Sequence, residues 1–139
     1  MTGPVPALAE AALALVGCPF RLHGRDPATG LDCVGLVAAA LAATGAEPVA
    51  PSGYGLRNLS IGQWLPLALP SGLVPADGPI RAGDVLLIAL PHSQHHLVIA
   101  VDPARVVHAH AGLRRVVIQP RDVAWQVVSQ WRLANRREG

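Results

Sequence analysis

Cys33 stands at a position in the sequence where a reactive thiol is expected. It follows Gly30-Leu31-Asp32 and precedes an apolar, alanine-rich run that ends at Ala43. An aspartate directly before such a run is typical of a helix N-cap, which predicts Cys33 in the first turn of a helix. The helix dipole and the exposed backbone N–H groups favour an anion there, so the pattern predicts a thiol pKa below its free value of about 8.5. Asp32 is accordingly interpreted as a helix cap rather than a catalytic acid.

Histidines that could serve such a thiol are concentrated in the C-terminal half of the chain. Five of the six histidines lie between residues 92 and 110. The two apolar segments that carry His96 and His108 are joined by the turn Asp102-Pro103, so they are expected to pair as neighbouring strands. With Cys33 these two histidines would form a nucleophile, a base and a residue that orients the base.

The histidine cluster leaves alternatives open. His95 competes with His96 for the role of base, and His110 competes with His108. Strand parity does not separate 108 from 110, and the spacing of twelve residues from His96 favours His108. A zinc site is a further alternative, with ligands drawn from His92, His95, His96 and His108 or His110. No known zinc spacing and no Cys-x-x-Cys pair accompanies them, so neither a metal nor a cofactor is expected.

The order of the predicted elements indicates the fold class. Helices are predicted over residues 6–16 and 33–44, with a Gly-rich loop over 17–30 between them, and a short helix around 60–65. Apolar runs bounded by turn residues then predict strands over 85–90, 96–101, 105–110, 113–119 and 127–133. Helices followed by strands predict an α+β domain in which the helix of Cys33 packs on an antiparallel sheet of about five strands.

Composition limits the classes of function. The chain has 139 residues, 51% hydrophobic and 14% charged, which predicts one folded domain over 1–139. Its net charge is +2, and the doublets Arg114-Arg115 and Arg136-Arg137 are isolated, so nucleic-acid binding is not expected. Two cysteines, Cys18 and Cys33, do not make a disulfide framework.

Membrane attachment is not expected either. No apolar stretch approaches the length of a membrane span. Leu15-Val16-Gly17-Cys18 matches a lipoprotein cleavage box, but no lysine or arginine precedes it, and Pro4, Pro6 and Glu10 interrupt the signal pattern. We therefore expect synthesis in the cytoplasm without a signal peptide.

Three blocks of the sequence, in the same order as in the family, resemble the NlpC/P60 family of cysteine peptidases. They cover the loop with the nucleophile helix, the first core strand, and the catalytic-histidine strand with the third polar residue. The blocks are Gly17 to Pro27 with Gly30 to Val37, Gly83 to Leu87, and His96 to Val101 with Val107 to Ala109. Phe20 stands where the family usually has a tyrosine.

The resemblance implies a papain-like fold and hydrolysis of the peptide stem of peptidoglycan, between D-glutamate and diaminopimelate. It also implies that Cys33 is the nucleophile, His96 the base and His108 the residue that orients the base. The segment from His108 to Gly112 resembles the branch associated with tails of phages and gene transfer agents. That branch implies tail proteins as partners and action on the cell wall from a particle. The alternatives are a structural or wall-binding tail component without turnover, and an acyltransferase that uses the same Cys-His site.

Overall fold

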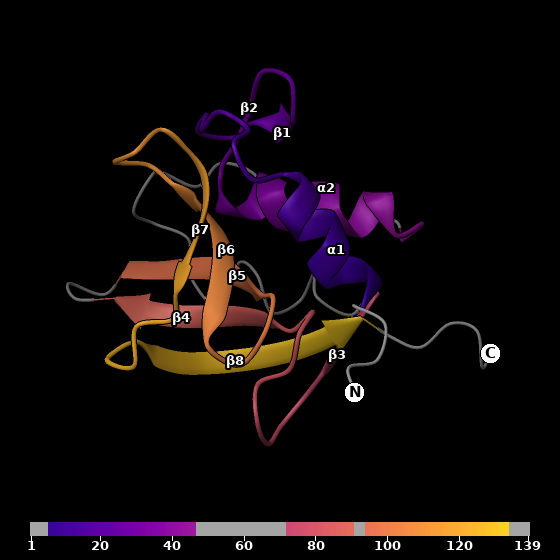
Figure 1. Cartoon of the computed structure of the whole chain (residues 1–139), viewed down its shortest axis with the longest axis vertical. Coiled ribbons are helices and arrows are strands. Elements are labelled where there is room, and N and C mark those ends of the chain that lie inside the picture. The colour runs from indigo at the N-terminus through magenta and orange to yellow at the C-terminus, as the bar shows by residue number, and fades with distance from the viewer. Residues whose placement is uncertain (1–5, 47–71, 91–93, 134–139) are drawn as a thin grey trace.

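The computed structural model describes residues 6–46, 72–90 and 94–133, so the short helix predicted around 60–65 lies outside the described residues. Two helices, α1 (Ala7–Ala14) and α2 (Cys33–Ala43), lie together on one side of a sheet (Figure 1). Both were predicted to within two residues at each end. Helix α2 is followed by Gly45 with φ of 92°, a left-handed conformation that glycine adopts without strain.

The main sheet has six strands, all antiparallel to their neighbours, in the order β3-β8-β4-β5-β6-β7. The strands are β3 (Leu73–Pro75), β4 (Val85–Leu90), β5 (Gln94–Ala100), β6 (Arg105–His110), β7 (Arg115–Pro120) and β8 (Gln126–Leu133). The predicted α+β class with an antiparallel sheet is confirmed, and β3 adds one strand to the five expected. A small hairpin of β1 (Arg25–Asp26) and β2 (Gly30–Leu31) begins within the segment 17–30 predicted as a loop and ends one residue beyond it.

Apolar side chains cover both faces of the central strands. On the face under α2, Leu87, Leu97, Ile99 and Val107 join the buried residues of the helix in one cluster. Their neighbours in the alternating pattern form a second cluster on the opposite face, made of Leu86, Ile88, Val98 and Val106. Burial on both faces explains why β4 reads as a continuous apolar run rather than an alternation.

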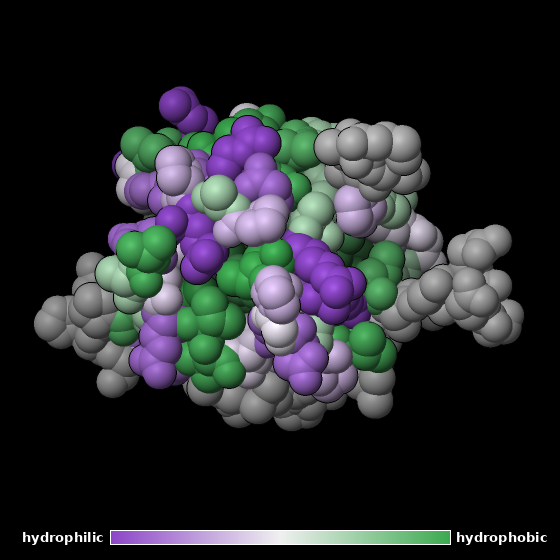
Figure 2. Space-filling model, turned by 60° about the horizontal axis from the view of Figure 1, so that its bottom comes forward, coloured by the Kyte–Doolittle hydropathy of each residue, from purple (hydrophilic) through white to green (hydrophobic). Residues whose placement is uncertain are grey.

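The surface beyond β8 is mixed in polarity. On the face turned forward in Figure 2, which is the lower side of Figure 1 where β8 lies, polar and apolar side chains are interleaved. An open hollow of about 470 Å³ is lined by residues 75–78 and 127–131. Neither Cys33 nor any histidine contributes to that hollow. Within the described residues, neither helix is long and apolar enough to cross a membrane.

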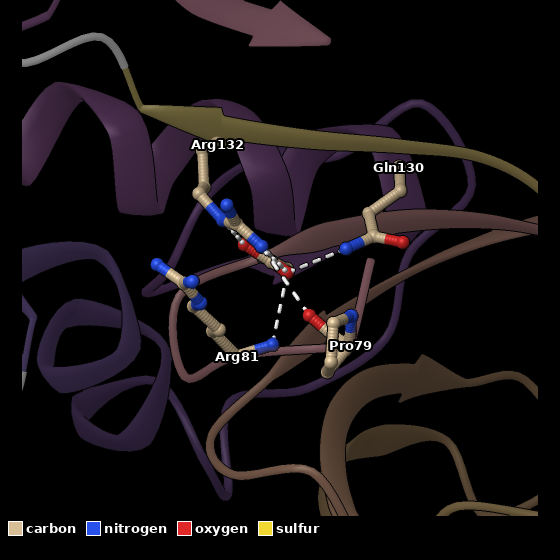
Figure 3. Close-up of polar contacts among 5 residues, drawn as sticks. Pro79, Arg81, Gln130 and Arg132 are labelled. Carbon is tan, nitrogen blue, oxygen red and sulfur yellow. Dashed lines mark hydrogen bonds and ion pairs between the residues drawn. The ribbon is translucent and has the colours of Figure 1, made fainter. Parts of the chain in front are cut away.

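A buried carboxylate joins the start of β4 to β8 (Figure 3). Asp84 is completely buried, and its carboxylate accepts hydrogen bonds from Nε of Arg132 at 2.7 Å and from Nη2 at 3.1 Å. The side-chain amide of Gln130 and the backbone N–H of Arg81 each donate at 2.9 Å. A buried charge is tolerated only when it is paired and hydrogen-bonded, and Asp84 meets both conditions.

Replacing Asp84 should therefore destabilise the fold strongly. We expect Asp84→Ala to lower the free energy of unfolding by about 3 kcal/mol, because Arg132 and Gln130 lose their acceptor. Arg105→Ala is the matched control, since it breaks an ion pair to Asp102 in which Arg105 is 58% exposed, and it should cost less than about 1 kcal/mol. Urea unfolding measures both values. Equal losses in the two variants would contradict the conclusion that the buried carboxylate of Asp84 stabilises the fold.

Candidate active site

Asp32 caps α2 and holds the preceding loop against it, as the sequence predicted for this residue. Its Oδ1 accepts the backbone N–H of Gly35 at 2.8 Å, the hydrogen bond of an N-cap. Its Oδ2 accepts the backbone N–H of His23 at 2.8 Å, and Nη1 of Arg25 lies 3.1 Å from Oδ1. These contacts fix the loop directly beside Cys33, the first residue of the helix.

Glycines allow the loop to lie directly on the first turn of α2. A Cβ on Gly35 would overlap the carbonyl oxygen of Gly24, and a Cβ on Gly24 would overlap the carbonyl of Gly30. Side chains larger than hydrogen are therefore excluded at these contacts. No role was predicted for Gly24 or Gly35, and the signal that could have found them is that glycines lie on both sides of Asp32 in the sequence.

The thiol of Cys33 lies where two strands separate. The backbone N–H of Leu97 donates to it. The backbone of Ala100 is hydrogen-bonded to Asp84 and Gly83, on the β4 side of β5. Because successive residues of a strand bond to opposite sides, the N–H of Leu97 points toward β6. The pairing of β5 with β6 is limited to Ile99 with Val107 and Ala100 with Val106. Figure 1 shows β6 and β7 running across the direction of β4, β5 and β8, which leaves that N–H for the thiol.

The predicted low pKa of this thiol is wrong. Burial raises the pKa of Cys33 from 9.0 to about 12, and the carboxylate of Asp32 adds to the rise. The N–H groups of Leu97, Val34 and Cys33 itself lower it, but by less. The helix N-terminus thus acts as expected and is outweighed by desolvation, which depends on packing that the local sequence does not reveal. At neutral pH the resting side chain is a thiol.

His96 and His108 meet as predicted, and they continue into a third residue. Nε2 of His96 lies 2.9 Å from Nδ1 of His108, with the two rings edge to face at 83°. Nε2 of His108 lies 2.8 Å from Oε1 of Gln119 on β7. Between the described side chains of Cys33 and His96 there is no hydrogen bond. The thiol instead interacts with the backbone N–H of Leu97, the residue that follows His96 in β5.

Both imidazoles are neutral in the resting site. Burial lowers the pKa of His96 to about 3, with smaller contributions from His108 and His110. Burial also lowers the pKa of His108, opposed by its hydrogen bond to Gln119. A neutral imidazole has one donor and one acceptor nitrogen. Because Oε1 of Gln119 only accepts, His108 carries its proton on Nε2 and accepts from His96 at Nδ1. His96 is then protonated on Nε2, and its Nδ1 is the free base.

The other histidines take different positions. Nδ1 of His110 accepts the backbone N–H of Leu113 at 3.1 Å, and its ring centre lies 5.4 Å from that of His108. Nδ1 of His95 is buried without a hydrogen-bond partner. His92 lies outside the described residues. Among residues 6–46, 72–90 and 94–133, no group of three potential ligands is placed to hold a metal ion.

Comparison with known proteins adds to this geometry at the level of the fold. No protein-family model and no curated protein matches the chain. The NlpC/P60 domain of the peptidoglycan hydrolase SagA matches 90% of this chain and 98% of that domain, with a TM-score of 0.58 and 22% identity. The peptidoglycan hydrolase RipB from Mycobacterium tuberculosis matches 97% of this chain and 74% of that one, with a TM-score of 0.65 and 19% identity.

A Staphylococcus aureus protein described as similar to lipoprotein, of the NLP/P60 family, gives a TM-score of 0.65 at 17% identity. The match covers 95% of this chain and only 42% of the staphylococcal one. At such identities the likeness is one of fold. The chain therefore has the α+β, papain-like fold of NlpC/P60 domains, as the sequence predicted.

The raised pKa of Cys33 predicts how the thiol reacts. In a Cys18→Ser background, alkylation of Cys33 by iodoacetamide should be slow at pH 7 and should still be rising at pH 10, because only the thiolate reacts. The same protein unfolded in urea is the matched control, and its rate should level off above about pH 9. Mass spectrometry of the labelled peptide gives both rates. A plateau below pH 8 in the folded protein would contradict the neutral resting thiol.

The lowered pKa of His96 predicts a loss of stability in acid. Below the ordinary histidine pKa of 6.5 the unfolded chain binds a proton that the folded chain does not take up until about pH 3. Stability is thus complete above pH 6.5 and falls as the pH falls, by about 3 kcal/mol at pH 4 from this group. Urea unfolding of wild type and His96→Gln measures it. The variant should lose less stability between pH 7 and pH 4, and an unchanged slope would contradict the assignment.

Proposed function

We propose that this chain is a cysteine peptidase of the NlpC/P60 family that hydrolyses an amide bond in the stem peptide of peptidoglycan. One observation carries the proposal. The thiol of Cys33, at the N-terminus of α2, accepts the N–H of Leu97, and the next residue back along β5 is His96, hydrogen-bonded to His108. These contacts support the proposal that a nucleophile, a base and a residue that orients the base act together where β5 and β6 separate.

The neutral resting state determines the order of proton transfers. As Sγ of Cys33 attacks the carbonyl carbon, the thiol proton passes to Nδ1 of His96, so no free thiolate has to form first. His96 then gives that proton to the leaving amine as the C–N bond breaks, and a thioester remains. Water, deprotonated by His96, attacks the thioester and releases the acid and the thiol. The missing Cys33–His96 hydrogen bond would form as substrate enters, since such bonds are often long in free enzymes.

The helix N-terminus supplies donors for the oxyanion. The N–H groups of Cys33 and Val34 lower the pKa of the thiol, so they lie close to it. The N–H of Gly35 donates to the carboxylate of Asp32. The N–H groups of Cys33 and Val34, which precede it in the first turn, can therefore donate to a ligand. They are placed to donate to the carbonyl oxygen as it gains charge, which serves in place of the hydroxyl that Phe20 lacks.

The substrate class rests on the fold and on the sequence blocks. SagA and RipB are described as peptidoglycan hydrolases, and this chain shares their fold. We propose the bond between D-glutamate and diaminopimelate, as the family resemblance implies. Association with a phage-like tail, and action on the wall from such a particle, are further parts of this proposal, supported by the segment from His108 to Gly112.

A second function is favoured by one specific observation. Burial that raises the pKa of Cys33 is also what an inert core thiol would show. It favours a structural tail component that binds wall peptide without cleaving it. An acyltransferase would use the same thioester and differ only in the acceptor that attacks it.

Hydrolysis of purified stem peptides, followed by mass spectrometry, tests these functions together. Wild type should release the free acid. Cys33→Ala should lose about a thousandfold or more in rate, and His96→Gln about a hundredfold to ten-thousandfold. Cys18→Ser is the matched control and should retain the wild-type rate. Binding of the peptide without any product would establish the structural alternative, and a new amide or ester would establish acyl transfer.

A further inference from the structure

Gln119 lies beside His108, on the same face of the paired strands β6 and β7. In the pairing of β6 with β7, Val106 faces Gln119 and His108 faces Val117. Gln119 is therefore diagonal to His108 on the same face, within reach of a long side chain. Its Oε1 lies 2.8 Å from Nε2 of His108, which is only 6% exposed. The ring of Trp125 packs edge to face on His108, with centres 6.1 Å apart.

We propose that Gln119 is a positioning residue that sets which nitrogen of His108, and through it which nitrogen of His96, carries the proton. The inference deepens the proposed function, because the atom it controls is the base that takes the proton of Cys33. With Oε1 toward His108, the hydrogen bonds from His96 to His108 and from His108 to Gln119 run in the same direction. His96 donates from Nε2 to His108, His108 donates from Nε2 to Gln119, and Nδ1 of His96 is left with its lone pair.

Turning the amide of Gln119 around would reverse both of these hydrogen bonds. A donor at that position would make Nε2 of His108 the acceptor and place the proton on Nδ1. His108 would then donate to Nε2 of His96, and the proton of His96 would move to Nδ1. The proposed base, the lone pair on Nδ1 of His96, would be lost without any movement of the rings. The choice between the two states thus lies with a side chain whose hydrogen bond is to His108 rather than to Cys33 or His96.

The burial of His108 makes a residue in this role necessary. Its Nε2 has Gln119 as partner, and with the ring 6% exposed, little water is available to replace that acceptor. The apolar side chains of Val106 and Trp125 lie on this face, together with the rings of His96 and His110. A buried donor without an acceptor costs about 1–3 kcal/mol, enough to shift the balance between two tautomers tenfold or more.

Three substitutions of Gln119 separate this role from simple packing. Gln119→Glu keeps an acceptor and removes the donor. Gln119→Lys keeps a donor and removes the acceptor, and Gln119→Met removes both with similar length. The readout is the tautomer of His96 and His108 in ¹⁵N-labelled protein, from two-bond ¹H–¹⁵N correlation spectra at pH 7, without substrate.

We expect both histidines to be protonated on Nε2 in wild type and in Gln119→Glu. In Gln119→Lys and Gln119→Met we expect the Nδ1–H form of His96 to appear, with kcat lowered about tenfold and KM unchanged. Wild-type tautomers in both of these folded variants would overturn the inference. The readout requires no turnover, so it is independent of the proposed function. If wild type cleaves no stem peptide but the tautomers respond, the proposed function fails and the role of Gln119 stands.

Discussion

The carboxylate of Asp32 is the constraint on which the site depends. It is hydrogen-bonded to three parts of the chain: the N–H of Gly35 in the first turn of α2, the N–H of His23 in its left-handed conformation, and the guanidinium of Arg25. The charge is buried, so each of these donors is needed to offset its desolvation. The loop is thereby fixed over the helix terminus, and Cys33 has little freedom to move away from β5.

The sheet provides the second half of the arrangement. Strong curvature separates β6 from β5 after two paired residues, and the unpaired N–H of Leu97 becomes available to the thiol. The same separation lets His96 and His108 contact each other through their side chains rather than through a backbone ladder. Desolvation is the cost of building the site between packed elements, and it explains why both the thiol and the imidazoles rest uncharged.

Features encoded locally were predictable from the sequence. The cap at Asp32, both helices and five strands follow from short-range patterns, and the meeting of His96 with His108 follows from a turn between two strands. Strand β3 was missed because three residues ending in a proline carry no periodicity. The pKa of Cys33 and the contact of Gln119 with His108 were beyond reach, since both depend on burial and on the register between β6 and β7.

The raised pKa of Cys33 has a consequence for oxidation. Peroxides and disulfides react with thiolates, and the fraction of thiolate at neutral pH falls tenfold for each unit by which the pKa rises. Cys33, the proposed nucleophile, rests as a protonated thiol and is accordingly protected from conversion to sulfenic acid and from mixed disulfides. The packing that raises the pKa of Cys33 thus also protects the thiol under oxidising conditions that would inactivate an exposed thiolate.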